Sequence, residues 1–241
     1  MRNELIRLAI MNHGNYWALR KAVESGAQGD PGIRIPKAIT ILDEDYPARL
    51  LELQYPPYVL FYTGNKELLK KPAAAVVGSR KVCEYGARAT EDIVRQIADA
   101  YVIVSGMAKG IDAIAHWNGK ESIGVLGNGL NIDYPIENRE LYEYMRNKQL
   151  LISEYPLNER PRAYYFPFRN RIIAALADKI IVTQAASRSG TLITVNAALD
   201  LNRNVYVLPY PYGSVYGAGC NELIQQGANV IRKSAVDELL R

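Results

Sequence analysis

The sequence predicts an α/β protein with a doubly wound, mainly parallel sheet and a small helical segment at its N-terminus. After Pro72, short apolar runs alternate with longer amphipathic stretches, and such alternation is typical of parallel strands with helices on both faces of the sheet. Glycine-rich turns follow the first three apolar runs. The chain has 241 residues, 49% of them hydrophobic, which is enough to fill such a core. These observations predict an extended Rossmann-like domain.

The first 36 residues are expected to form the helical segment and a connector. Apolar side chains recur at roughly helical spacing between residues 3 and 25, with an interruption at His13-Gly14-Asn15, so the pattern predicts two short helices. The run Gly29-Asp30-Pro31-Gly32 is typical of a turn. We therefore divide the chain into a segment of residues 1–36 and a Rossmann-like domain of residues 37–241.

The larger part begins with a lead-in that prolines divide into short pieces, with a predicted strand over residues 58–62. The later apolar runs predict strands at residues 73–77, 101–104, 123–126, 150–153, 179–183 and 204–208. The amphipathic stretches between them predict helices at residues 84–100, 112–120, 137–148, 170–177 and 191–201. In this architecture ligands bind beyond the carboxyl ends of the strands.

Composition and missing motifs exclude several classes of protein. No apolar run approaches the roughly 20 residues of a membrane span, and the N-terminus lacks a secretory signal, so we expect a cytoplasmic protein. Cys83 and Cys220 are far apart and predict neither a disulfide framework nor a metal site. Neither a G-x-G-x-x-G fingerprint nor a Walker A motif is present, so we expect no cofactor and no ATP hydrolysis. The net charge of +4 permits a polyanionic partner without identifying one.

The turns after the first three strands of the main domain combine glycine with hydroxyl and basic side chains. They are Gly78-Ser79-Arg80, Ser105-Gly106 with Lys109 close behind, and Gly127-Asn128-Gly129. Glycine lets a phosphate approach the backbone, and a helix N-terminus favours an anion. Glycines also simply permit tight turns, but three converging turns favour a phosphate site. Ser189-Gly190-Thr191, before the helix at 191–201, is either another such site or a helix cap.

An aromatic and basic cluster contains Phe166, Arg169, Asn170 and Arg171. Aromatic faces stack on unpaired bases while guanidinium groups pair with phosphates, a combination expected at a single-strand nucleic-acid site. The alternative is that the aromatic rings belong to the core and the arginines are surface charges. Pro167 favours the first interpretation because it marks the exposed first turn of a helix.

Several ordered sequence blocks resemble the DprA/Smf family over most of residues 42–231. The blocks are Val77-Gly78-Ser79-Arg80, Ser105-Gly106-Met107-Ala108-Lys109-Gly110-Ile111-Asp112, Leu126-Gly127-Asn128-Gly129-Leu130, Ile152-Ser153-Glu154-Tyr155-Pro156, Phe166-Pro167-Phe168-Arg169-Asn170-Arg171-Ile172-Ile173-Ala174, Ser189-Gly190-Thr191-Leu192-Ile193-Thr194 and Gly219-Cys220-Asn221-Glu222-Leu223-Ile224. The resemblance implies a non-enzymatic protein that binds single-stranded DNA, protects incoming DNA, forms a homodimer and loads the RecA recombinase during natural transformation. It implies no bound cofactor.

The resemblance also assigns residues. It implies that Arg80 holds phosphate and Phe166 meets a base, with Arg169 and Arg171 as further candidates. Many relatives have a basic residue where this chain has Ala163, and the sequence leaves open whether Arg160 or Arg162 replaces it. Dimer contacts are implied for the segment containing Glu222, Leu223 and Ile224. Some relatives append a winged helix, and the sequence predicts none here.

The competing interpretation is an enzyme that cleaves nucleoside monophosphates, because related Rossmann-like hydrolases also bind phosphate at glycine-rich turns. Those relatives carry a carboxylate where this chain has Thr194, so a general acid or base is missing from that position. Asp112 and Glu154 are other carboxylates, although Asp112 is also suited to capping a helix and Glu154 to pairing with an arginine. His116 stands alone in the sequence and is predicted to be structural.

Overall fold

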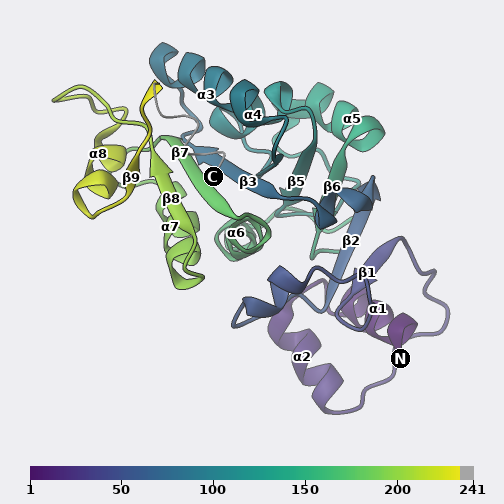
Figure 1. Ribbon diagram of the computed structural model, residues 1–241. Coiled ribbons are helices and arrows are strands. Elements are labelled where there is room, and N and C mark those ends of the chain that lie inside the picture. The colour runs from purple at the N-terminus through teal and green to yellow at the C-terminus, as the bar shows by residue number, and fades with distance from the viewer. Residues whose placement is uncertain (234–241) are drawn as a thin grey trace.

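Seven parallel strands form the centre of the sheet, and an antiparallel pair extends one edge. The computed structural model describes residues 1–233, and the strand order is β1-β2-β6-β5-β4-β3-β7-β8-β9 (Figure 1). The strands are β1 (Ala38–Thr40), β2 (Val59–Gly64), β3 (Ala73–Gly78), β4 (Val102–Ser105), β5 (Ser122–Leu126), β6 (Leu150–Ser153), β7 (Lys179–Gln184), β8 (Asn204–Val207) and β9 (Asn229–Val230). The pairs β1·β2 and β2·β6 are antiparallel. The predicted mainly parallel sheet is therefore confirmed.

Helices cover both faces of this sheet. Those described are α1 (Arg2–Met11), α2 (Tyr16–Glu24), α3 (Glu84–Ile97), α4 (Ile111–Asn118), α5 (Arg139–Lys148), α6 (Tyr165–Leu176), α7 (Thr191–Asp200) and α8 (Ala218–Gln225). Helices α3, α4 and α5 lie over one face, while α6 and α7 lie over the other (Figure 1). Three short 3-10 helices complete the set, at Ala48–Glu52, Lys66–Lys70 and Ile136–Asn138.

Every predicted helix and strand is present, with shifted ends. The main difference is α6, which begins at Tyr165 rather than at residue 170, so Phe166 and Pro167 lie inside its first turn. Proline is tolerated there because the first N–H groups of a helix have no partner within the helix. The short elements β1, β9 and α8 were not predicted, because two- to eight-residue segments carry little periodicity.

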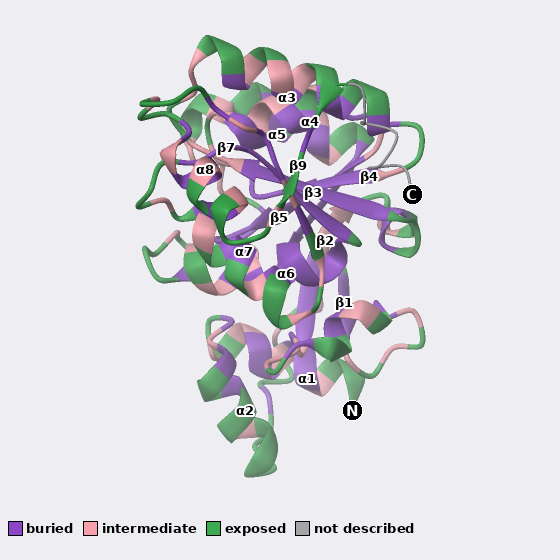
Figure 2. Ribbon diagram, turned by 60° about the vertical axis from the view of Figure 1, so that its left-hand side comes forward, coloured by how far each residue is buried: buried purple, intermediate pink, exposed green. Residues whose placement is uncertain are grey.

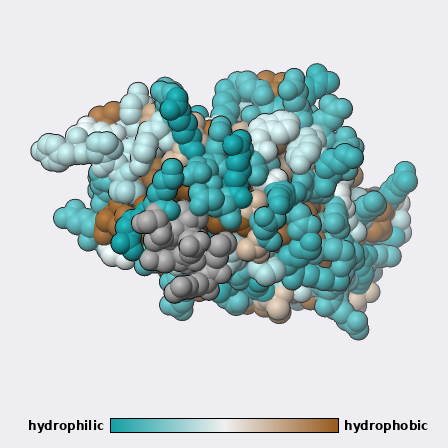
Figure 3. Space-filling view, turned by 45° about the horizontal axis from the view of Figure 1, so that its top comes forward, coloured by the Kyte–Doolittle hydropathy of each residue, from teal (hydrophilic) through white to brown (hydrophobic). Residues whose placement is uncertain are grey.

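Burial follows the layering. Strand β3 has the sequence Ala-Ala-Ala-Val-Val-Gly and its first five residues are buried, as expected of a parallel strand covered on both faces. Figure 2 shows the strands and α6 as mainly buried, with the outer helices exposed on the side away from the sheet. The face in Figure 3 is mostly hydrophilic, with scattered apolar spots. Within residues 1–233, no helix has both the length and the apolar character needed to cross a membrane.

The order in which the chain adds strands to the sheet switches sides at β3. From β3 the strands proceed through β4 and β5 to β6, and the chain then crosses back over α6 to place β7 on the other side of β3. Ser79 N donates to Gln184 O at 2.9 Å, which joins the carboxyl ends of β3 and β7. Such a switch point leaves a crevice because the connections on its two sides cover opposite faces.

The N-terminal helices pack on the end of the sheet that carries β1 and β2 (Figure 1). Leu5 and Ile6 of α1 share a buried cluster with Val59 and Phe61 of β2 and with Leu141 of α5. The two predicted short helices are confirmed. The division of the chain at residue 36 stays a prediction, and this cluster joins the two sides of that boundary.

Candidate functional site

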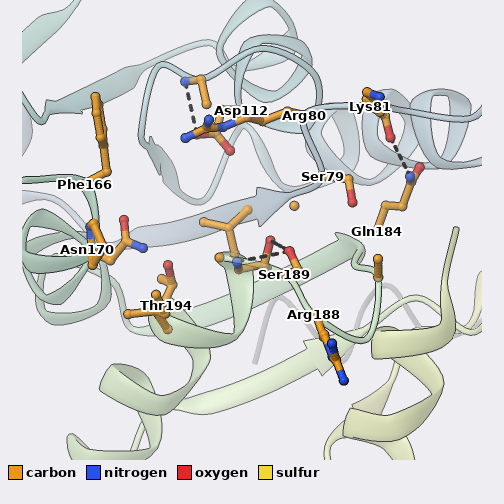
Figure 4. Close-up of a pocket in the computed structure, with 18 of the residues that line it drawn as sticks. Ser79, Arg80, Lys81, Asp112, Phe166, Asn170, Gln184, Arg188, Ser189 and Thr194 are labelled. Carbon is orange, nitrogen blue, oxygen red and sulfur yellow. Dashed lines mark hydrogen bonds between the residues drawn. The ribbon is translucent and has the colours of Figure 1, made fainter. Parts of the chain in front are cut away.

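A pocket of about 760 Å³ lies at the switch point, beyond the carboxyl ends of β3 and β7. Its walls are the turn after β3, the first turns of α6 and the segment that leads into α7 (Figure 4). Nine residues that the sequence predicted for the site line this pocket: Gly78, Ser79, Arg80, Phe166, Arg169, Asn170, Ser189, Gly190 and Thr191. The tertiary structure thus brings together three segments that are far apart in the sequence.

The pocket is electropositive. Its lining contains Arg80, Lys81, Arg169 and Arg188 against a single carboxylate, Asp112. Arg80, Lys81 and Arg188 are exposed, and Figure 4 shows Arg188 pointing away from the centre of the pocket. Lys81 and Arg188 were not predicted, although each directly adjoins a predicted residue. Exposed cations beside concave walls attract an anionic ligand.

Helix α6 contributes an aromatic ring and an amide to one side of the pocket. Phe166 and Asn170 are four residues apart, so they share a face of the helix, and Figure 4 shows both at the same wall. The edge of the Phe166 ring lies against the backbone of Gly127, where a Cβ atom would stand 2.7 Å from Phe166 Cδ1. Gly127 therefore positions the ring and does not itself line the pocket.

The N-terminus of α7 forms the opposite side. Ser189 Oγ accepts from Thr191 N at 3.2 Å and donates to Thr191 Oγ1 at 2.9 Å. Both roles considered from the sequence are thus compatible, since Ser189 satisfies a helix-terminal N–H and also lines the pocket. A Cβ atom at Gly190 would meet nothing within 4 Å, so this backbone is open to a ligand.

Arg169 forms the floor of the pocket. It is only 5% exposed, and its Nη1 donates to Gly106 O at 2.8 Å and also to Val125 O. Desolvation lowers the pKa of Arg169 and raises the pKa of Asp112, while attraction between the two side chains opposes both shifts. A Cβ atom at Gly106 would lie 2.7 Å from two guanidinium nitrogens, so Gly106 makes room for this arginine.

Of the two predicted phosphate-binding turns after β4 and β5, only the first reaches the pocket, through Ala108. The residues predicted to bind phosphate there contact other protein groups instead. Ser105 Oγ donates to Val76 O at 2.7 Å, and Gly129 N donates to Glu159 O at 2.8 Å. Lys109 pairs with Glu137. Residues outside the pocket lining are therefore Ser105, Gly106, Lys109, Gly127, Gly129 and Arg171.

Arg171 points from α6 toward Glu154 instead. Its Nη1 and Nη2 donate to the two carboxylate oxygens at 2.8 and 2.6 Å, and its guanidinium carbon lies 3.7 Å from the centroid of the Phe168 ring. Both charged side chains are nearly buried, with 11% and 6% exposed. The expected pairing of Glu154 with an arginine is confirmed, and Arg171 does not line the pocket.

The two arginines just before Ala163 lie outside the pocket lining. Ala163 lines the pocket, whereas neither Arg160 nor Arg162 does. Arg162 Nη2 lies 3.2 Å from Glu159 Oε1, and its Nη1 donates to Tyr164 Oη. The additional pocket cations are instead Lys81 and Arg188.

Of the residues considered for acid–base chemistry, His116 lies in the core, whereas Asp112 and Thr194 line the pocket. His116 is fully buried, with Nδ1 2.6 Å from Ser122 Oγ, and desolvation together with repulsion by Arg169 lowers its pKa to about 3. It is therefore neutral at physiological pH. Thr194 lines the pocket, as does Asp112, whose Oδ2 accepts from Gly106 N and Ala108 N at 3.2 Å each. In the described part of the chain, no cluster of three or more metal-ligating side chains occurs.

The residues expected at a dimer interface lie on α8. Leu223 is only 6% exposed and belongs to the hydrophobic core, so its side chain is not available to a partner. Glu222 is exposed and Ile224 is partly buried. A contact through this helix would therefore use Glu222 and its exposed neighbours.

Comparison with known proteins agrees with this architecture. Residues 37–240 match the family of DNA recombination-mediator protein A. The DNA processing protein DprA of Streptococcus pneumoniae is 43% identical over 198 residues, which cover 80% of this chain and 70% of that protein. The chain belongs to the DprA/Smf family. Protein Smf of a Synechocystis strain is 40% identical, and the match covers 81% of this chain but only 52% of that relative.

Two solved DprA structures share the fold. The structure of DNA processing protein A from Streptococcus pneumoniae matches with a TM-score of 0.83 and 34% identity, covering 98% of this chain and 95% of that chain. The Helicobacter pylori protein, described for its single-stranded DNA binding mode, matches with a TM-score of 0.79 and 30% identity, covering 85% and 96%. The predicted family and fold class are confirmed.

The buried pair of Arg171 and Glu154 predicts a stability effect. We expect Arg171→Met and Glu154→Gln each to lower the free energy of unfolding by about 3–5 kcal/mol, because either change leaves a buried charge without its partner. Urea unfolding monitored by circular dichroism measures this. The combined replacement Arg171→Met with Glu154→Gln should lose less than the sum of the two single changes. Single-variant losses below about 1 kcal/mol would contradict a structural role.

The low pKa of His116 predicts a pH effect. Because the unfolded chain takes up a proton near pH 6.5 that the folded protein takes up only near pH 3, acidification through this window favours unfolding by about 1.4 kcal/mol per pH unit. Between pH 7 and pH 5, the drop in unfolding free energy should be smaller by about 2 kcal/mol in His116→Gln. An equal drop in His116→Gln and in the unaltered protein would exclude His116 as the titrating group.

Proposed function

We propose that this chain binds single-stranded DNA in the pocket at the switch point. The observation that carries the proposal is one concave site that has groups suited to bind phosphate on two walls and an aromatic ring on a third. Ser79 and Arg80 follow β3, the α7 N-terminus faces them, and Phe166 projects from α6 (Figure 4). Its family membership and the Helicobacter pylori relative described for single-stranded DNA binding support the same function.

The phosphate part rests on Arg80, the residues at the α7 N-terminus and the floor arginine. Exposed Arg80 is free to move toward a phosphate, and Gly190 leaves the α7 backbone open. Helix N-termini bind anions through free N–H groups and the helix dipole. Arg169 is buried and fixed, so it contributes charge beneath the site rather than a mobile contact. Its Nε has no hydrogen-bond partner within residues 1–233.

The base part rests on Phe166 and Asn170. Phe166 is half-buried and its ring is held against Gly127, so stacking a base on it requires little loss of side-chain freedom. Base–aromatic stacking tolerates any sequence because every base has a flat face. Asn170, one helical turn further along α6, offers a donor and an acceptor to a stacked base.

At the level of the cell, we infer a cytoplasmic protein that protects incoming DNA and loads the RecA recombinase onto it during natural transformation. This inference rests on the family. It includes a homodimer, in which α8 would contact its copy through Glu222 and exposed neighbours. Light scattering at micromolar concentration tests the dimer, and RecA filament assembly on single-stranded DNA with and without the protein tests the loading.

Substitutions at the two kinds of contact should have different signatures. Arg80→Ala should weaken single-strand binding and make the slope of log K against log salt shallower by about 0.7, the value for one phosphate contact on a single strand. Phe166→Ala should weaken binding by about 1–3 kcal/mol with the slope unchanged, because stacking releases no counterion. Fluorescence anisotropy of a labelled oligonucleotide over a range of salt concentrations measures both.

Matched controls lie on the opposite face of the sheet. Arg88 on α3 and Trp117 on α4 are exposed and do not line the pocket, so Arg88→Ala and Trp117→Ala should bind as the unaltered protein does. The site would be refuted if the control variants lost as much affinity as Arg80→Ala and Phe166→Ala. Release of free base from a nucleoside monophosphate would instead favour the hydrolase interpretation.

Gly190 gives a test that separates binding from folding. Gly190→Ala should change the unfolding free energy by about 1 kcal/mol or less, because Gly190 has right-handed helical backbone angles that alanine adopts without strain and the added Cβ meets nothing within 4 Å. A phosphate bound to the α7 N-terminus would meet the added methyl group, so single-strand affinity should fall several-fold. Gly106→Ala provides the contrast, since its Cβ would collide with Arg169 and should destabilise the fold. Unchanged affinity in Gly190→Ala would remove the α7 N-terminus from the site.

A further inference from the structure

Tyr134 is an exposed aromatic residue at the edge of the pocket that the sequence did not single out. It lies in the loop between β5 and the 3-10 helix Ile136–Asn138, lines the pocket and is 43% exposed. An aromatic side chain that remains exposed beside a basic cavity is available to a ligand with a flat apolar face.

The ring of Tyr134 is stacked on Phe166. The two centroids are 5.5 Å apart and the planes are inclined by 30°, an offset arrangement favourable for aromatic rings. Phe166 is also fixed from the side, where its edge lies against the backbone of Gly127. Tyr134 therefore extends the aromatic surface of Phe166 beyond the wall formed by α6.

The loop that carries Tyr134 is anchored at several points. The backbone carbonyl oxygen of Tyr134 accepts a hydrogen bond from Oη of the buried Tyr142 at 2.7 Å. Asn138 Nδ2 donates to Met107 O and Ala108 O at 3.0 Å each, and Glu137 pairs with Lys109. These contacts tie the loop to the turn after β4, so the backbone presents the ring in a defined position without a ligand.

The geometry points to Tyr134 as a second base-binding residue, which forms with Phe166 a two-ring platform for neighbouring bases of a single strand. This inference rests on the proposed function of the pocket. The rings are too close for a base to enter between them, because a base in van der Waals contact with two rings separates them by about 7 Å. A base must therefore stack on an open face or edge of each ring. The platform selects unpaired nucleic acid, since bases in a duplex have no free face.

The test compares oligonucleotides with and without bases. Tyr134→Ala should weaken binding of a short oligothymidylate about tenfold, within the range for loss of one stacked base. The Tyr134→Ala variant should bind an oligonucleotide of the same length built from abasic sites as tightly as the unaltered protein does. Tyr134→Phe keeps the ring and should bind both as the unaltered protein does, and Trp117→Ala is the control for loss of an exposed ring. Thermal unfolding checks that each variant is folded.

A double-mutant cycle distinguishes direct stacking from mere support of Phe166. If Tyr134 contacts a base itself, Tyr134→Ala should lower oligothymidylate affinity further in the Phe166→Ala background. No further loss in that background, an equal loss with the abasic strand, or unchanged affinity in Tyr134→Ala overturns the inference. The underlying function is tested separately. If Arg80→Ala weakens binding and Tyr134→Ala does not, the pocket stands and only the platform fails, whereas unchanged binding in Arg80→Ala counts against the pocket itself.

Discussion

The pairing of β3 with β7 is the constraint on which the candidate site depends. Residues 74–78 align with 179–184 in parallel, with a register shift at the end where Ser79 N donates to Gln184 O. Because α3 leaves β3 over one face of the sheet and α7 leaves β7 over the other, no connection closes the space beyond their carboxyl ends. The crossover from β6 to β7 lays α6 along one side of that opening. Arg80, Phe166 and Gly190 become neighbours only through this arrangement.

Consecutive residues of α6 have separate roles because an α-helix turns by about 100° per residue. Asn170 faces the pocket with Phe166, whereas Arg169 points beneath it to the carbonyl groups at the ends of β4 and β5. Arg171 turns away to Glu154. Desolvating a guanidinium group is costly, so each buried arginine needs carbonyl or carboxylate partners. The arginines of this cluster therefore shape the site, while the exposed arginine after β3 is free to bind.

The glycines near the pocket, like the arginines, either make room for other side chains or leave the backbone open to a ligand. Gly106 leaves room for the Arg169 guanidinium and Gly127 for the Phe166 ring, so each determines where another side chain stands. Gly190 is different, because nothing in the protein occupies the space above its Cα. A glycine in a strand-end turn thus favours either close packing or ligand approach, and the difference lies in what surrounds it.

The sequence by itself determined the α/β class, the order of the main helices and strands, the two N-terminal helices and the family. Secondary structure depends mainly on residues close together in the sequence, so hydrophobic periodicity reveals it. The family is recognised from motifs that occur in a fixed order and spacing. The sequence also singled out Ser79, Arg80, Phe166 and Asn170, which line the pocket in the structure. Only the tertiary structure decided that the pocket opens beyond β3 and β7, with Ala108 as the one contribution of the turn after β4 and none from Gly127-Asn128-Gly129. The order of strands in a sheet depends on contacts between distant segments, and residue type alone does not tell whether an arginine or glycine meets protein or solvent.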